Sequence, residues 1–295
     1  MKKTSGARVE VMLFTDPYCS WCWASEPMFF ALAEKYREQL HFIHVFGGLV
    51  KDMDDFSDGD HGITGALDVL PHWKEVSEYS GQPIDESIWV DIAKIRHFSS
   101  WPANIACKAA FLQDEKLGEK FLRNMRQKVQ TDRKIISLEE VYLEIAQEIE
   151  GLDIERFKRD LKNGNAQSAF EEDLRQGMRW GANVFPTLLF YRSDADPEHL
   201  TPDNATSIGG YHSTKTYDEI IRRLVPDITV YEARDEKTLL ENYGPLTERE
   251  LAEIKSRKIS DQMSILEDLE KAGIVRRISK VRGNLWTVFS DQNIE

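Results

Sequence analysis

Strand-like and helix-like patterns alternate over the first 46 residues. Residues 9–14 form a β-favouring run that ends at Thr15-Asp16-Pro17, and residues 41–46 form a second run that ends at Gly47-Gly48. Between the two runs, from Cys19 to Gln39, apolar residues recur at the spacing of an amphipathic helix. A strand, a helix and a parallel strand make a βαβ unit, which a right-handed crossover closes.

The middle of the chain is predicted to be helical, because strand-like runs are absent from about residue 52 to residue 181. The expected helices include residues 103–117, residues 138–149 with Ser137 as N-cap, and residues 154–161 with Asp153 as N-cap. Two strands and a helix follow, over residues 186–191, 207–211 and 216–224. The second of these strands is short and is expected at the edge of the sheet.

The tail after Pro226 is predicted to be a separate unit. Thr247 and Glu250 have the spacing of a capping box and begin a helix that reaches residue 254. Ser260 is expected to cap a second helix, which ends at Gly273. A hairpin of residues 274–278 and 285–289 completes the pattern. We therefore expect a linker or helix over residues 227–244 and a winged-helix-like module over residues 245–295.

Composition narrows the class of protein. The 295 residues carry 38 basic and 51 acidic side chains, a net charge of −13, which argues against nucleic acid or an anionic membrane as a partner of the whole molecule. The three cysteines are too few for a disulfide framework. No apolar run approaches the roughly 18 residues that span a bilayer, and the first residues lack the apolar stretch of a signal peptide. We expect a cytoplasmic location.

Cys19 and Cys22 lie where the first strand passes into the first helix. Cysteines three apart in a first helical turn can form a reversible disulfide, and the helix N-terminus stabilises a thiolate. Cys19, nearer the terminus, is expected to have the lower pKa and to attack, and Cys22 to resolve the mixed disulfide. The alternatives are two inert thiols or a zinc site. Zinc would need a second ligand pair, and the remaining Cys107 stands alone. We expect no metal and no cofactor.

A second element, Val184-Phe185-Pro186-Thr187, places a proline at the start of a predicted strand. The proline is either an ordinary strand-edge residue or the centre of a cis-proline loop. A cis bond would leave the backbone of Phe185 facing the cysteines, where it could receive an extended substrate peptide. Its position after a βαβ unit with two cysteines favours the second interpretation.

This order of elements resembles the thioredoxin fold of the DsbA family over about residues 7–226. The stretch Asp16-Pro17-Tyr18-Cys19-Ser20-Trp21-Cys22-Trp23 looks like the cytoplasmic FrnE-like branch, also called predicted protein-disulfide isomerases, as do Gly47-Gly48-Leu49 and residues 181–187. The resemblance implies that Cys19 is the nucleophile, Cys22 the resolving cysteine and Pro186 the cis-proline. It also implies a thiol-disulfide oxidoreductase or isomerase with a disulfide-containing or thiol client and a cellular redox partner.

The resemblance fixes the expected fold class as α/β. Residues 1–226 are expected to form a DsbA-like thioredoxin domain with a helical insertion over about residues 52–181. The small α+β winged-helix-like domain follows it. A DsbA-like domain with a small C-terminal domain also looks like the ClpXP adapters that deliver the regulator Spx for proteolysis. This similarity implies a non-catalytic adapter that binds a partner protein, although Ser20-Trp21 between the cysteines departs from the motif expected for that adapter.

Several residues near the motif have two interpretations each. Tyr18 and Trp21 are expected to form an apolar platform for a client peptide, with core packing as the alternative. Trp101 opens a helix and is a candidate for the groove above the cysteines. Cys107 is an inert buried thiol or a partner in a regulatory disulfide. Asp16 tunes the redox pair or simply forms the turn before the helix.

The tail invites a DNA-binding hypothesis, because winged helices often place their second helix in the major groove. The expected second helix carries Asp261, Glu267, Asp268 and Glu270 against the single Lys271. That face would repel phosphate. The hairpin holds a local basic wing of Arg276, Arg277, Lys280 and Arg282. We expect a protein contact or homodimerisation through this module rather than DNA binding.

Overall fold

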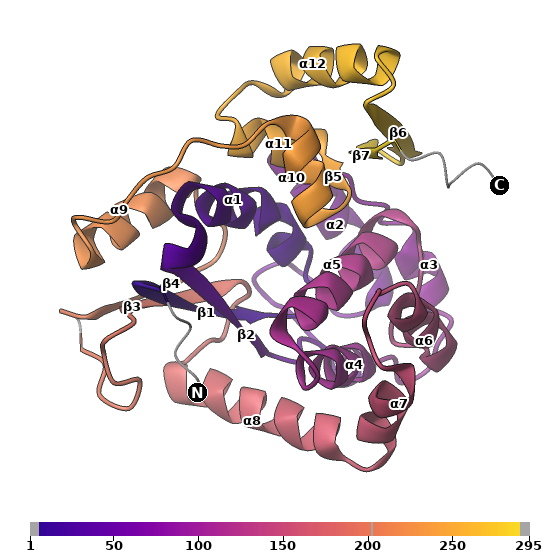
Figure 1. The fold of residues 1–295 in the computed structure, drawn as a ribbon. Coiled ribbons are helices and arrows are strands. Elements are labelled where there is room, and N and C mark those ends of the chain that lie inside the picture. Colours follow the sequence, from indigo (N-terminus) through magenta and orange to yellow (C-terminus); the bar gives the residue numbers. More distant parts are fainter. Residues whose placement is uncertain (1–5, 202, 290–295) are drawn as a thin grey trace.

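The computed structural model describes residues 6–201 and 203–289 of the chain (Figure 1). Its central sheet has four strands in the order β2-β1-β3-β4. β1 (Val9–Thr15) runs parallel to β2 (Leu40–Phe46) and antiparallel to β3 (Thr187–Arg192), and β4 (Ala205–Gly209) pairs with β3 at the edge. The predicted βαβ start and the ββ finish are therefore present, with the edge strand two residues earlier than expected.

Helices cover both faces of this sheet, because successive strand side chains point to opposite sides. On one face, β1 packs through Val11 and Leu13 against α1 (Ser20–Tyr36) and α9 (Thr214–Leu224). On the other face, Met12 and Phe14 lie in a cluster that Trp180, at the end of α8 (Asn165–Trp180), also joins. Figure 1 shows the two layers. This layered α/β arrangement is the thioredoxin-like core that the sequence predicts.

The insertion between β2 and β3 is helical, as predicted. Its helices before α8 are α2 (Val69–Ser80), α3 (Ile88–Ile92), α4 (Trp101–Phe111), α5 (Glu115–Thr131), α6 (Glu139–Gln147) and α7 (Ile154–Lys162). Short 3-10 helices cover Arg37–Gln39, just before β2, and Ala66–Asp68. The buried side chains of these helices form one large apolar cluster, which extends to Tyr18 and Trp23 beside the cysteines.

Two details of the predicted insertion are wrong. Residues 103–117 form parts of two helices, because the Asp114 carboxylate accepts from the backbone of Lys116 and Leu117 and so begins α5 anew. Ser137 caps no helix, since its hydroxyl donates to the carbonyl of Ser99 at 2.6 Å. Asp153, by contrast, caps α7 as predicted.

The tail contains the predicted helices and hairpin, together with a two-residue strand, Leu246–Thr247, that was not predicted. They are α10 (Glu236–Tyr243), β5 (Leu246–Thr247), α11 (Glu248–Ile254), α12 (Ile259–Lys271), β6 (Val275–Lys280) and β7 (Gly283–Val288), with a small sheet in the order β5-β7-β6. Thr247 and Glu250 form the predicted capping box of α11. The prediction for Ser260 is wrong, because it lies inside the first turn of α12, and Lys258 occupies the N-cap position without a side-chain bond. The assignment as a winged helix stays a prediction.

The tail packs on α1, the helix that follows the cysteines (Figure 1). Ala31 joins one apolar cluster with Leu251 of α11 and Trp286 of β7, and the rings of Phe30 and Tyr243 lie 5.1 Å apart. We use "C-terminal module" below for residues 236–288. The module is thus built directly onto the back of the cysteine-bearing helix.

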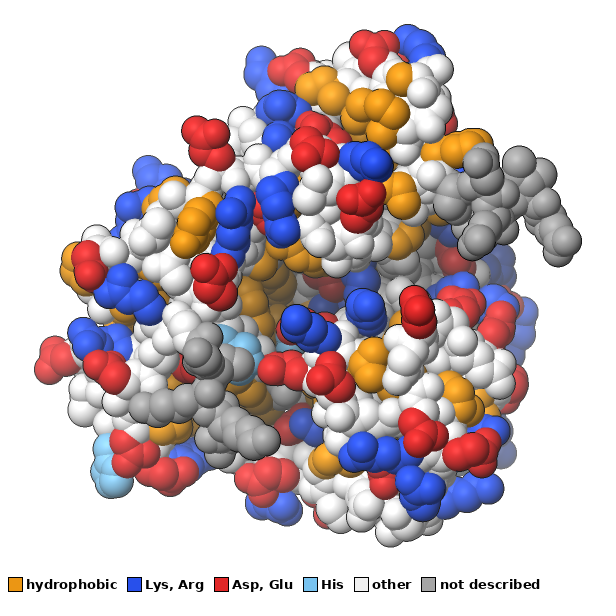
Figure 2. All heavy atoms as spheres, in the orientation of Figure 1, with side chains coloured by type: hydrophobic (Ala, Val, Ile, Leu, Met, Phe, Trp, Pro, Cys, Tyr) orange, Lys and Arg blue, Asp and Glu red, His pale blue; other side chains and the backbone are white. Residues whose placement is uncertain are grey.

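The predicted basic wing faces other parts of the same chain. Lys280 pairs with Asp132, and Arg282 pairs with Glu86 at 2.5 Å, both in the helical insertion. Arg277 lies within 3.3 Å of Glu267 and Glu270 of α12. Figure 2 shows acidic and basic side chains intermixed over the face it presents. These pairs give the wing charges an intramolecular role, while homodimerisation stays a prediction.

Among the described residues, no helix combines the length and the apolar character that crossing a membrane requires.

Candidate functional site

Cys19 occupies the N-cap of α1, and Cys22 lies within its first turn. The Cys19 sulfur accepts a hydrogen bond from the backbone N–H of Cys22 at 3.1 Å. Cys22 is completely buried, whereas Cys19 is 5 % exposed and lines a small cavity. Both cysteines are free thiols here. The two sulfurs therefore lie in one helical turn, and only that of Cys19 faces the cavity.

The proline loop lies directly against Cys19. The Phe185–Pro186 peptide bond is cis, as predicted. The Cys19 thiol donates to the carbonyl of Phe185, with 3.5 Å between sulfur and oxygen. Pro186 and Thr187 are buried, and the Thr187 hydroxyl closes the loop by donating to Val184 at 2.7 Å. The predicted juxtaposition of the cysteines and the Phe185 backbone is present.

Gly47 controls the position of the Phe185 ring. A Cβ at Gly47 would lie 1.9 Å from the Cζ atom of that ring, so Gly47→Ala must displace the ring, which belongs to the residue whose carbonyl accepts from Cys19. We expect the rate at which Cys19 reacts with a small aromatic disulfide to change at least fivefold, about 1 kcal/mol in barrier. Stopped-flow absorbance measures that rate.

Gly177→Ala is the matched control, because a Cβ at this helical position meets nothing within 4 Å. It should leave the reaction of Cys19 unchanged. An unchanged rate in Gly47→Ala as well would show that the ring position does not govern the reactivity of Cys19.

The cavity at Cys19 has a volume of about 150 Å³ and largely apolar walls. Its lining includes Tyr18, Trp21, Met53, Trp73, Trp89 and Phe185. Tyr18 is buried and accepts a hydrogen bond from the backbone of Ser137, so it is part of the wall rather than an exposed platform. Trp101 does not line the cavity, contrary to one expectation. Its indole donates to the carbonyl of Gly48 at 3.1 Å.

Trp21 is the centre of an aromatic cluster at the mouth of the site. Its ring lies 5.8 Å from Tyr79, 5.5 Å from Tyr211 and 6.2 Å from His72. Trp21 is half-buried and Tyr79 is 70 % exposed, so the cluster presents aromatic surface to solvent. Sequence reasoning missed Tyr79 and Tyr211, because α2 and the loop after β4 meet Trp21 only in the folded chain.

The two thiols have different electrostatic environments. Burial and then the neighbouring Cys22 sulfur raise the pKa of Cys19. Burial also raises the pKa of Cys22, but hydrogen bonding from Cys19 and the positive charge of Arg126 outweigh it, so the net direction is down. The expected order of the two pKa values is therefore reversed. The hydrogen bond from Cys19 is the larger cause of the lowered pKa of Cys22, and Arg126 of α5, which no sequence pattern places at the cysteines, is the second.

Asp16 ties the cysteine turn to its surroundings. Its carboxylate is buried and accepts hydrogen bonds from Tyr18 N–H, Leu49 N–H, the Ser100 hydroxyl and the Asn104 amide, all at 2.8–2.9 Å. Burial is the main cause of its raised pKa, and its charge adds to the raised pKa of Cys19. Asp16 thus has both of the roles left open, as a turn residue and as a charge near the redox pair.

Neither Cys107 nor a metal cluster joins this site in the described part of the chain. Cys107 is fully buried in the helical insertion, and burial raises the pKa of its thiol, which fits the inert alternative. One group of three side chains there could share an ion, namely Asp52, Asp54 and His97. These are surface groups already paired through the histidine, and none of them lines the cavity at Cys19.

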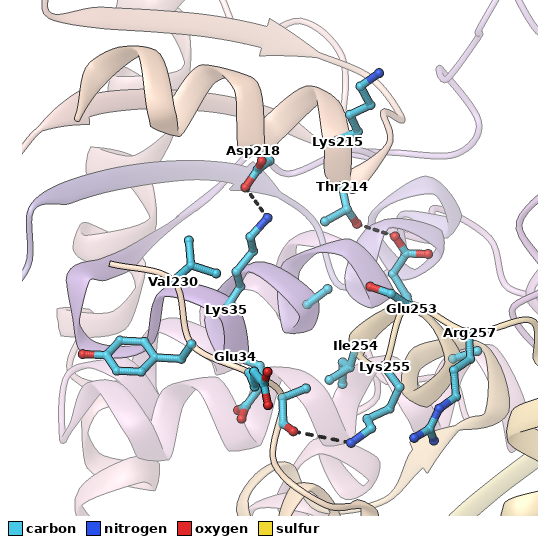
Figure 3. Close-up of a pocket in the computed structure, with 16 residues that line it drawn as sticks. Glu34, Lys35, Thr214, Lys215, Asp218, Val230, Glu253, Ile254, Lys255 and Arg257 are labelled. Carbon is cyan, nitrogen blue, oxygen red and sulfur yellow. Dashed lines mark hydrogen bonds and ion pairs between the residues drawn. The ribbon is translucent and has the colours of Figure 1, made fainter. Parts of the chain in front are cut away.

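A larger cavity, of about 730 Å³, lies between α1, α9 and the C-terminal module (Figure 3). Polar side chains that line it pair with one another. Lys35 forms an ion pair with Asp218 at 2.6 Å, and the Thr214 hydroxyl donates a hydrogen bond to Glu253. Lys255 donates to the main-chain carbonyls of residues 233 and 234. These contacts join α9 to α1 and to α11, and Lys255 to the segment before α10, so the charged and polar groups named here serve packing between elements.

Comparisons with known proteins cover both the core and the tail. The profile of the family described as Thioredoxin matches residues 12–218. The ClpXP adapter protein SpxH of Bacillus subtilis is 26 % identical over 97 % of this chain and 91 % of its own length, and that of Bacillus cereus strain ATCC 14579 is 27 % identical over 92 % and 87 %.

Among solved structures, the cytosolic disulfide reductase DsbM of Pseudomonas aeruginosa superposes with a TM-score of 0.51. It is 20 % identical, with 74 % of this chain and 93 % of DsbM covered. At this identity the likeness concerns the fold. It agrees with the DsbA-like arrangement of the sheet and the helical insertion. The profile match spans well over half of the residues, and the chain belongs to the thioredoxin family, with a DsbA-like fold.

Proposed function

We propose that the chain is a thiol-disulfide oxidoreductase acting on protein clients. One observation carries the proposal: the Cys19 sulfur opens into an apolar cavity and faces the carbonyl of the cis-proline loop at 3.5 Å. An extended client backbone can lie along this loop with its disulfide at Cys19. The Trp21 cluster provides adjacent apolar surface for the rest of the client.

The two pKa shifts fit a division of labour between the cysteines. The Cys22 thiolate accepts the proton of Cys19, and the resulting Cys19 thiolate attacks one sulfur of the client disulfide. The client's other sulfur leaves as a thiolate and takes the proton from Cys22. Cys22, again a thiolate beside Arg126, then attacks Cys19, which releases the second client sulfur and leaves an internal disulfide. Two electrons have passed to the client.

A cellular thiol must then reduce the Cys19–Cys22 disulfide to restore the starting state. We also propose a cytoplasmic location, where thiols are kept reduced and where reduction or isomerisation of clients is favoured over net oxidation. The low cysteine count of the chain agrees with such a compartment. Isomerisation requires only that the client, rather than Cys22, resolves the mixed disulfide.

The test is turnover on a disulfide-bonded protein such as insulin, with a thiol reductant present. We expect Cys19→Ser to abolish the catalysed reduction, because Cys19 is the cysteine that lines the cavity. Cys107→Ser is the matched control, since that thiol is buried in the insertion. A wild-type chain that is folded, has titratable thiols and shows no turnover would exclude the oxidoreductase proposal.

A second candidate function is that of an adapter that binds a protein partner for proteolysis. It is favoured by the relatives named ClpXP adapter protein SpxH, whose similarity extends through the C-terminal module. In this function the Trp21 cluster and the cavity hold the partner and no electrons need pass. Cys19→Ser then leaves stimulation of ClpXP degradation of the partner at the wild-type level. A loss of stimulation in this variant would tie adapter activity to the thiol.

A further inference from the structure

A continuous chain of buried ion pairs runs from Arg126, which bonds to Thr15 just before the cysteine turn, to the C-terminal module. Arg126 pairs with Glu26 at 2.7 Å, Glu26 pairs in turn with Arg123, and Arg123 forms a bidentate pair with Glu250 at 2.7 Å for both bonds. All four side chains are at least nine-tenths buried. We call these four residues the ion-pair chain. It links α1 and α5 of the thioredoxin part to α11 of the module.

The ion-pair chain reaches the cysteine turn at one end and the capping box of α11 at the other. At one end, Arg126 bonds to the Thr15 hydroxyl and its charge acts on the Cys22 sulfur. At the other end, Glu250 is the acidic member of the α11 capping box and also accepts from the Gln82 amide at 2.9 Å. Arg123 additionally donates to the carbonyl of Pro245 at 3.0 Å. The module therefore contributes one of the two carboxylates that neutralise the arginines below the cysteines.

The charge of this buried group changes with the redox state. With the cysteines joined as a disulfide, the ion-pair chain holds two arginines and two carboxylates and is neutral. Reduction restores the Cys22 thiol, whose pKa is lowered, and when this thiol ionises its negative charge draws on Arg126 and competes with Glu26 for it. Charges in a water-poor interior interact more strongly than in solvent, so the extra charge is transmitted along the pairs.

We propose that Glu250 of the C-terminal module is a positioning residue for the Cys19–Cys22 pair, acting through Arg123, Glu26 and Arg126 to set the stability of the Cys22 thiolate. The inference rests on the proposed redox role of the pair. By linkage, the redox state of the cysteines changes how tightly α11 docks, to the same extent as docking changes the thiol-disulfide equilibrium. The docking of the module then depends on the redox state of the cysteines, and the thiol-disulfide equilibrium depends on that docking.

The first test is Glu250→Gln in the full chain. Glutamine retains a side-chain oxygen for the capping box but removes the charge. Arg123 then draws more strongly on Glu26, Arg126 is freed toward Cys22, and the reduced form gains stability. We expect the equilibrium constant between the protein dithiol with glutathione disulfide and the protein disulfide with two glutathiones to shift three- to tenfold toward the reduced protein. A tenfold shift is about 30 mV for this two-electron couple.

Glu241→Gln is the matched control. It removes the same charge from the same module, but Glu241 is half-exposed and pairs only with Lys237, at 3.6 Å, among its described contacts. The equilibrium constant should stay at the wild-type value in this variant. An unchanged constant in a folded Glu250→Gln would overturn the inference and leave the proposed oxidoreductase intact. A wild-type chain that forms no Cys19–Cys22 disulfide at any glutathione ratio would instead remove the proposed function itself.

A second measurement needs no variant. Hydrogen exchange of the α11 amides is compared between the oxidised and the reduced wild-type chain, with the amides of α12 as the internal reference. We expect exchange in α11 to differ about threefold or more between the two states, because Glu250 is held there by the ion-pair chain, whereas α12 contributes none of its members. Equal exchange in both states contradicts the coupling even if Glu250→Gln fails to fold.

Discussion

The Cys22→Ser variant is expected to accumulate a covalent complex with its client, joined through Cys19. Cys19 lines the cavity and can be reached by a client disulfide, whereas Cys22 is completely buried behind it. Without Cys22 the mixed disulfide has no internal thiol to resolve it. It should persist for minutes to hours, the timescale of uncatalysed disulfide rearrangement. Non-reducing electrophoresis with insulin as the client measures the complex directly.

Cys19→Ser provides the matched comparison, because it keeps one thiol of the same pair. We expect no complex from this variant, although the remaining Cys22 has the lowered pKa. Accessibility therefore decides the attacking sulfur, and the lowered pKa serves proton transfer and resolution. A trapped complex in Cys19→Ser but not in Cys22→Ser would show that Cys22 attacks, as the order of pKa values alone would suggest.

The sequence predicts this site well where the relevant interactions are local. A strand, two cysteines and a helix follow one another directly, and the residues of the proline loop are contiguous, so their geometry depends on short segments. The capping box of Thr247 and the N-cap formed by Asp153 are equally local and are confirmed. Serine is also a common capping residue, but neither Ser137 nor Ser260 caps a helix. The Ser137 hydroxyl donates to the carbonyl of Ser99 instead, and Ser260 lies inside the first turn of α12.

The parts of the site that were not predicted come from segments far apart in the chain. Arg123 and Arg126 lie in a helix rich in charged residues, a composition typical of a solvated face. They are buried because Glu26 of α1 and Glu250 of α11 pair with them in the folded chain. These partners lie far apart in the sequence, and no periodic pattern of residues predicts such a pairing. The basic wing is a second case in which pairing between distant segments was not predicted. Its charge suggests an external partner, but Asp132 and Glu86 of the insertion lie opposite it.

Arg123→Met should cost more stability than any other single change considered for the ion-pair chain, about 3–5 kcal/mol in the free energy of unfolding of the docked module. The methionine keeps much of the packing against Trp23 and Phe30, over whose rings the guanidinium lies at 4.6 Å and 5.2 Å. The loss therefore comes from Glu250, which stays buried with its charge and without its bidentate partner. Urea unfolding with hydrogen exchange of α11 measures it.

Two further variants separate charge burial from packing. Arg175→Met removes an arginine that is 58 % exposed and pairs with Glu172 on the surface, so it should cost less than about 1 kcal/mol. Combining Arg123→Met with Glu250→Gln removes both ends of the buried pair and should restore at least about 1 kcal/mol relative to Arg123→Met alone. If the double variant were instead as unstable as the sum of the single changes, the two residues would contribute independently. The module would then dock by its apolar contacts with α1, and the charge of Glu250 would have no route to the cysteines.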